Sequence, residues 1–282
     1  MALQKKILLH LLVALLVALV MQWIFLQWAG IACEAFFPSA VGEDALQKQM
    51  LVKAAASSIG LLLASWILYA WLYKKTLITA GFQLKGFAQN IPLSITVALG
   101  ILGLSAGILI GAGHISFTRS ADSRVEIVPA FLIMGMVALA EELFIRGCIQ
   151  RKLANMLPPY GAWLLTAAIF MLMHMGNPGQ NLLAMPGIFI GGLLLGVNYM
   201  FSGNLWFGIG LHWCWNFVQG CLLGFPVSGI ALPSLYRVQL LGPSWITGGN
   251  FGLEASVCTT VLQLAALWML YQIFSKNYQR KL

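Results

Sequence analysis

Apolar stretches long enough to cross a membrane recur along the whole chain. A membrane-spanning helix needs about 20 predominantly apolar residues, and eight stretches meet or approach this length, at approximately 7–29, 51–73, 91–113, 127–150, 160–176, 182–201, 204–224 and 255–274. Only 9% of the residues are charged, whereas about a quarter are charged in a soluble domain. The sequence therefore predicts an all-α fold, a polytopic membrane bundle of about eight transmembrane helices.

No soluble domain, linker or repeat of fixed period is visible, so residues 1–282 are predicted to form a single transmembrane domain. The first stretch follows Lys5 and Lys6, as a signal-peptide core would. It is too long for such a core and lacks a clear cleavage site, so we expect a retained span. The five cysteines form no CxxC pair, which favours apolar packing over disulfides or a zinc ribbon.

The distribution of Lys and Arg predicts the orientation, since eight spans place both termini on one side. Eleven basic residues fall on the side of the termini and five on the other. The first group is Lys5, Lys6, Lys74, Lys75, Lys85, Arg146, Arg151, Lys152, Lys276, Arg280 and Lys281; the second is Lys48, Lys53, Arg119, Arg124 and Arg237. We therefore expect a multi-pass protein of the plasma or inner membrane with cytoplasmic termini. The net charge of +8 then reflects contact with the lipid bilayer, not nucleic acid.

The fourth stretch contains two adjacent carboxylates, Glu141 and Glu142, although the chain has only eight acidic residues and the other six fall in loops or near span ends. An ionisable residue at membrane depth is costly, so the pair indicates a functional site. Glu142 and Arg146 are four residues apart, which favours an ion pair within one helix. Glu141 projects about 100° away from Glu142, so the two carboxylates need not share one role.

Three further polar side chains lie in the next apolar stretches: His174 in the fifth, and His212 and Asn216 in the seventh. The spacing of four places His212 and Asn216 on one helix face. Helix turns are expected at Pro158–Pro159 and at 202–204. Counting along the helices from these turns brings the polar groups to one level, in the half of the membrane nearest the termini.

This set of side chains suits hydrolysis. A carboxylate that is hydrogen-bonded to a histidine can deprotonate a water molecule, and a second histidine and an amide can stabilise an oxyanion. The same groups are also a ligand set for a divalent metal such as zinc, through two histidines and a carboxylate. The sequence contains no His-Glu-x-x-His and no P-loop, which argues against the usual zinc-helix proteases and ATP-driven pumps. No serine stands out as a nucleophile, which argues against a serine hydrolase.

Structural explanations stay open for the same features. An intramembrane histidine or asparagine is often an interhelical hydrogen-bonding group, and the Glu142–Arg146 pair can simply stabilise its helix. Glycines recur four apart in the sixth stretch, at Gly187 and Gly191 and at Gly192 and Gly196. They fit either close helix packing or space beside a substrate groove.

Three motifs resemble those of the CPBP family of intramembrane proteases, which includes the type II CAAX prenyl endopeptidases and the bacterial Abi proteins. They are Glu141-Glu142-Leu-Phe-Ile-Arg146, Phe170-Met-Leu-Met-His174 and His212-Trp-Cys-Trp-Asn216, each in its own stretch and in the family's order. The resemblance covers a catalytic core at about 128–223; the remaining spans are matched by hydrophobicity and number alone.

The resemblance implies that Glu141 and His174 activate water, while His212 and Asn216 stabilise the oxyanion. Glu142 and Arg146 would support the site. Members of the family are described both as metal-independent glutamate proteases and as metalloproteases; we favour no metal ligand and no cofactor here, because the sequence has no metal-helix motif. The expected function is an intramembrane endopeptidase that cuts a membrane-associated protein or peptide, and the CAAX substrate is not carried over.

Two other functions use the same residues. A non-catalytic immunity or scaffold protein would bind a peptide or membrane protein in the same cavity. A secondary transporter would use Glu141 or Glu142 as a proton relay, although the sequence shows no internal repeat. A phenotype that survives loss of the Glu141 carboxylate would favour the binding protein, and proton-coupled uptake would favour the transporter.

Overall fold

The computed structural model describes residues 2–36, 43–120 and 127–279. Each predicted membrane span coincides with a helix in the described residues. Six helical runs are long and apolar enough to cross a membrane, at Lys5–Ala35, Ala45–Trp71, Phe87–Gly111, Ile127–Leu153, Ala184–Ser202 and Val257–Tyr278. Two shorter apolar runs correspond to the fifth and seventh predicted spans. The prediction of an all-α polytopic membrane bundle is confirmed, with eight as an approximate count.

The long helices are α1 (Ala2–Phe36), α2 (Glu43–Ile67), α3 (Phe87–Gly111), α4 (Ile127–Glu142), α6 (Pro159–Met173), α7 (Ala184–Ser202), α8 (Trp206–Asn216) and α10 (Val257–Gln279). Three of them continue into wider π-helical turns: α2 into η1 (Leu68–Leu72), α4 into η3 (Leu143–Gln150) and α8 into η4 (Phe217–Leu222). Short helices are η2 (Leu77–Ala80), α5 (Arg151–Leu153), α9 (Ser244–Thr247) and η5 (Leu253–Ala255).

The turns that we expected between these helices are present. α6 begins at Pro159, whose fixed backbone suits the first helical position. α7 ends at Ser202, and Gly203 follows in the left-handed conformation at φ 64°. Glycine adopts this conformation without steric cost, so the chain can reverse here into α8.

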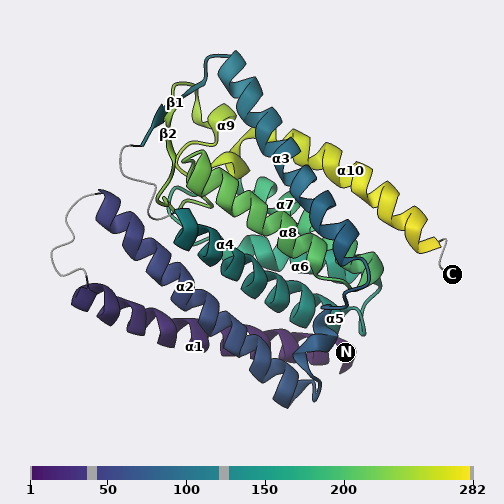
Figure 1. Cartoon of the computed structure of the whole chain (residues 1–282). Coiled ribbons are helices and arrows are strands. Elements are labelled where there is room, and N and C mark those ends of the chain that lie inside the picture. The colour runs from purple at the N-terminus through teal and green to yellow at the C-terminus, as the bar shows by residue number, and fades with distance from the viewer. Residues whose placement is uncertain (1, 37–42, 121–126, 280–282) are drawn as a thin grey trace.

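The helices form layers, with the helices that carry the predicted site residues in the middle (Figure 1). α1 packs on α2, α2 on α4, and α4 on α8; on the other side α3 packs on α8, and α10 on α7 and α3. Only 11% of the most apolar window of α1 is buried, against 61% for α7. The exposed leucines of α1 therefore require a lipid environment, whereas α7 lies at the centre of the bundle.

The two ends of the bundle differ. The start of α1 and the end of α10 lie at the same end (Figure 1), as an even number of spans requires. At the opposite end, β1 (Ile115–Arg119) pairs antiparallel with β2 (Tyr236–Leu240), with Ile115 opposite Leu240. Residues 37–42 and three of the counted basic residues, Arg124, Arg280 and Lys281, lie outside the described residues.

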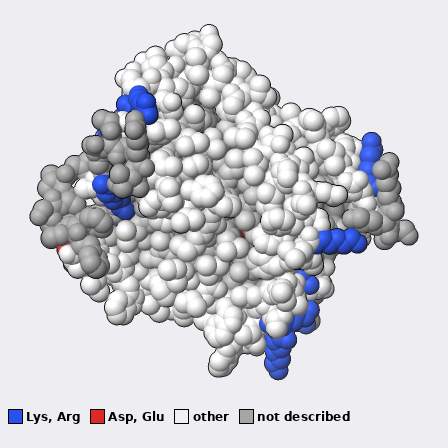
Figure 2. All heavy atoms as spheres, in the orientation of Figure 1, with Lys and Arg blue, Asp and Glu red and all other residues white. Residues whose placement is uncertain are grey.

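Charged side chains gather at the ends of the molecule. Figure 2 shows Lys and Arg in two groups on one face, separated by a broad band that is almost entirely uncharged. A band of this kind is expected for a protein that spans a bilayer, because charge is costly in hydrocarbon. The chain is therefore a multi-pass membrane protein, and the cytoplasmic position of its termini stays a prediction from the basic residues.

Candidate active site

A buried network joins Glu142, Arg146 and His212. Glu142 Oε1 accepts a hydrogen bond from Arg146 Nη1 at 2.7 Å and lies 3.0 Å from His212 Nδ1. The side chains of Glu142 and Arg146 are 0% and 1% exposed. The predicted ion pair along α4 is confirmed, and the network links α4 to α8.

Arg146 also binds two other helices of the core. Its Nη2 donates to the backbone oxygen of Gly192 in α7 at 2.7 Å, and its guanidinium carbon lies 4.9 Å from the centre of the Phe170 ring in α6. Our count of basic residues on the side of the termini included Arg146, which was wrong because this side chain is buried in the core. Without Arg146, ten basic residues fall on the side of the termini and five on the other side.

The partner of His212 fixes which ring nitrogen carries a proton. A carboxylate that forms an ion pair with arginine can only accept hydrogen bonds, so His212 Nδ1 must donate to Glu142. The other nitrogen, Nε2, then lies 3.8 Å from Glu141 Oε2. That distance is too long for a direct hydrogen bond, and 26% of the Glu141 side chain is exposed. Glu141 is therefore the more accessible carboxylate, beside the free nitrogen of His212.

His174 is held in a similar way by the backbone. It caps the end of α6, and its Nδ1 lies 2.8 Å from the carbonyl oxygen of Phe170. A carbonyl only accepts, so Nδ1 of His174 carries the proton and Nε2 is the free nitrogen. The Phe170 ring lies between the two histidines, with its centre 4.6 Å from His174 and 6.0 Å from His212.

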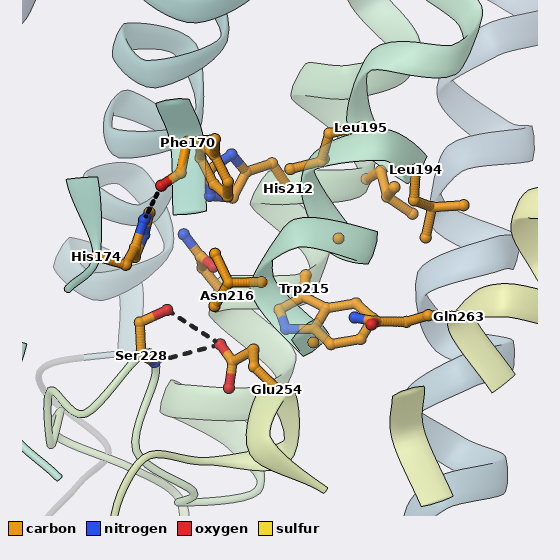
Figure 3. A pocket seen from close by; sticks show the side chains of 14 residues that line it. Phe170, His174, Leu194, Leu195, His212, Trp215, Asn216, Ser228, Glu254 and Gln263 are labelled. Carbon is orange, nitrogen blue, oxygen red and sulfur yellow. Dashed lines mark hydrogen bonds between the residues drawn. The ribbon is translucent and has the colours of Figure 1, made fainter. Parts of the chain in front are cut away.

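A cavity of about 50 Å³ brings three of the predicted residues together: His174, His212 and Asn216 line it (Figure 3). Its wall also includes Ser228, in the segment between η4 and β2, and Glu254, in η5 just before α10. The expectation that the site lies in the half of the membrane nearest the termini stays a prediction.

The glycines of α7 allow close packing, and two of them also line the cavity. Gly187 and Gly191 line the cavity. Gly192 and Gly196 pack against α6 instead, where an added Cβ would press on Ala167 and Trp163. Gly187 also permits close packing, since an added Cβ would clash with the Glu254 backbone oxygen. At Gly191 the nearest atom would be Gln263 Nε2 at 3.7 Å.

Glu254 is a residue of the cavity wall that our sequence reasoning missed. It is 5% exposed and accepts hydrogen bonds from Gln219 and from the backbone and hydroxyl of Ser228 (Figure 3). Burial raises the pKa of this carboxyl to about 7. Its position just before a predicted span gave no sign of burial, because acidic residues near span ends are usually solvated.

The described residues of the site give no support for a set of metal ligands. Within residues 2–36, 43–120 and 127–279, no three His, Cys, Asp or Glu side chains converge as a metal site requires. Glu142 is occupied by a guanidinium and by His212 Nδ1. We therefore derive no step that passes through a metal.

Comparison with known protein families gives one match, in the middle of the chain. Residues 123–218 match the family described as type II CAAX prenyl endopeptidase Rce1-like. This segment is similar to the Rce1-like family. It contains all six predicted site residues, and the match agrees with the CPBP resemblance. No curated protein and no solved structure matches the chain.

The match supports a role as a membrane protease. Three residues of the cavity wall, Ser228, Glu254 and Gln263, lie after the matched segment. The cavity is therefore completed by residues that the family match does not cover.

Proposed function

We propose that the protein is an intramembrane endopeptidase that hydrolyses a peptide bond in a membrane-associated protein or peptide. The observation that supports this most strongly is the convergence of His174, His212 and Asn216 on one cavity, with Glu141 3.8 Å from the free nitrogen of His212. A carboxylate, two imidazoles with free nitrogens and an amide supply both a base and oxyanion donors.

In the proposed reaction, Glu141 accepts a proton from a water molecule that also donates to the free Nε2 of His174. The water oxygen attacks the peptide carbonyl, and the resulting oxyanion accepts hydrogen bonds from the Asn216 amide and from His212. His212 can donate from Nε2 only when that nitrogen is protonated, because Nδ1 is already committed to Glu142. When the C–N bond breaks, protonated Glu141 returns its proton to the leaving amine.

Glu142 has a different role from Glu141 in this proposal. It is a positioning residue, which fixes the orientation of His212 through Nδ1 and is itself held by Arg146. A second carboxylate that orients an imidazole recurs in hydrolases of unrelated folds. The substitution of either glutamate therefore has a distinct expected outcome.

The substitution Glu141→Gln tests the proposal, since it removes the base but keeps the side-chain shape. We expect the variant to accumulate as folded protein and to lose cleavage by at least about a hundredfold, as for other general bases, with His174→Ala showing the same loss. The membrane proteomes of cells with the active and the Glu141→Gln forms are then compared. A protein that stays intact only in the variant identifies the substrate, and cleavage that is unchanged in Glu141→Gln refutes the assignment.

The same comparison separates an immunity or scaffold protein from a protease. A binding protein would keep its cellular phenotype in the Glu141→Gln form, because the cavity and its shape are retained. A protease would lose the phenotype together with cleavage.

A further inference from the structure

A second, larger hollow opens at the end of the bundle that carries the termini. Its volume is about 710 Å³, and it lies between the loop that leads into α3, the end of α7 and the end of α10. The polar side chains of its wall are mostly amides, with one lysine: Gln83, Lys85, Gln89, Asn90, Asn198, Ser202, Asn204, Asn277 and Tyr278. None of the described residues that line it is acidic, so its charge favours an anionic ligand.

Asn198 carries a buried donor that faces this hollow without a partner. The residue is 3% exposed, and its side-chain nitrogen has no hydrogen-bond partner among the described residues. Its side-chain oxygen accepts from Ser202 Oγ at 3.2 Å. Nearly all buried donors in proteins are paired, so an acceptor from a ligand is the expected partner of this nitrogen.

Two positive groups lie in the same wall. Lys85 is exposed, and its ammonium makes no ion pair within the described chain. α3 begins beside it at Phe87, and Ala88, Gln89 and Asn90 of its first turn line the hollow. A helix of 25 residues presents the positive end of its dipole there, which favours an anion.

We propose that this hollow binds a phosphate-ester anion, with Lys85 and the Asn198 amide as its donors beside the N-terminal end of α3. Phosphate oxygens accept hydrogen bonds from ammonium and amide groups at once. Pockets of this kind between transmembrane helices, at the membrane surface, bind lipid head groups. The chemistry is shared by an anionic phospholipid and by free phosphate, and it is independent of the proposed proteolysis.

The test is a binding titration with the purified full chain in a neutral detergent. The probes are dihexanoyl phosphatidic acid, dihexanoyl phosphatidylcholine and inorganic phosphate. We expect the phosphatidic acid to bind more tightly than the phosphatidylcholine. Lys85→Gln should weaken its binding by about tenfold, since a charged hydrogen bond is lost, and Lys85→Arg should retain it. Asn198→Asp should also weaken binding, because it replaces a donor with a second anion.

Lys75→Gln is the matched control, because it removes the same charge from a residue that does not line this hollow. Its affinity should equal that of the unchanged protein. Tight binding of inorganic phosphate, lost in Lys85→Gln, would identify free phosphate as the source of the ligand. The proposal is overturned if no anionic probe binds, or if Lys75→Gln and Lys85→Gln lose affinity equally.

Discussion

Each histidine of the site has one ring nitrogen committed to a group that can only accept. For His174 this group is a backbone carbonyl, and for His212 it is the Glu142 carboxylate. The two free nitrogens therefore differ in the group to which the opposite ring nitrogen donates, although the two side chains are chemically identical. This difference gives a physical basis for assigning water activation to His174 and oxyanion stabilisation to His212.

Glu142→Gln should mainly destabilise the protein. The change leaves Arg146, 1% exposed, without a counter-charge, and removing one partner of a buried ion pair costs about 3–5 kcal/mol. Thermal unfolding in detergent measures the effect, with Glu141→Gln as the matched control because Glu141 is partly exposed. We expect a lower midpoint for Glu142→Gln alone. Equal midpoints for the two variants would mean that the buried network contributes little to stability.

Cleavage should persist after metal chelation, because no described trio of ligands converges at the site. The measurement is cleavage of the identified substrate before and after treatment with a strong chelator, followed by removal of the chelator. Activity that disappears and returns on addition of zinc would contradict the metal-independent mechanism. A soluble zinc protease treated in parallel shows that chelation is complete.

The site residues were predictable where an ionisable or amide side chain interrupts an apolar run. Glu141, Glu142, His174, His212 and Asn216 all stand out for this reason, since each is costly at membrane depth. Glu254 did not stand out, because its burial depends on how a long loop folds back onto the helices. No local sequence pattern predicts that this loop packs against the helices.

At the scale of the helices, the two π-helical segments beside the site were not predictable. η3 begins directly after Glu142 and η4 directly after Asn216. An apolar run gives the same sequence pattern whether its turns are α or π, so only the existence of these helices could be predicted. π-helical turns occur often at functional sites. Here they begin directly after two of the site residues and change the direction in which the following side chains project.

Gly208→Ala should disturb the contact between α8 and α4. A Cβ at this position would come within 2.7 Å of Glu142 Oε2 and 3.0 Å of the Leu195 backbone oxygen. Overpacking of this kind costs about 1–3 kcal/mol, so we expect a lower unfolding midpoint and reduced cleavage.

Gly100→Ala is the control for this prediction, because a Cβ at Gly100 in α3 meets nothing within 4 Å. Alanine favours helix there, so this variant should be at least as stable as the unchanged protein. If Gly208→Ala matches Gly100→Ala in both stability and cleavage, the close approach of α8 to Glu142 is not needed.

At the scale of the whole molecule, the number of spans and the packing of the helices depend on different properties of the sequence. Span number and an even count of crossings follow from hydrophobicity, whereas packing partners such as α3 with α8 depend on side-chain shape across distant segments. Hydrophobicity alone could therefore predict a bundle of about eight helices. It could not predict that α1 would be mostly exposed to lipid and α7 mostly buried.

The stability of the folded protein should depend on pH through Glu254, which lies in the wall of the cavity. Burial raises the pKa of Glu254 to about 7, above the value of about 4.3 expected in an unfolded chain. Between these values the folded state binds more protons than the unfolded state, so stability falls as pH rises from about 4.5 to 7. The unfolding midpoint at pH 5 should exceed that at pH 8.

Glu254→Gln serves as the comparison for this pH dependence, since glutamine keeps the shape of the protonated acid and does not titrate. We expect the difference between the midpoints at pH 5 and pH 8 to shrink in this variant. A difference of the same size in Glu254→Gln would assign the pH dependence to other groups.

The shortness of α6 has a consequence for the supply of water. Its 15 residues cover roughly 22 Å at 1.5 Å per residue, whereas the hydrocarbon layer of a bilayer is about 30 Å thick. Lipid beside a segment this short thins locally or gives way to solvent. The polar turn that follows His174 can then lie below the surrounding head groups in contact with solvent, so that water reaches the residues that we propose to be catalytic without crossing hydrocarbon.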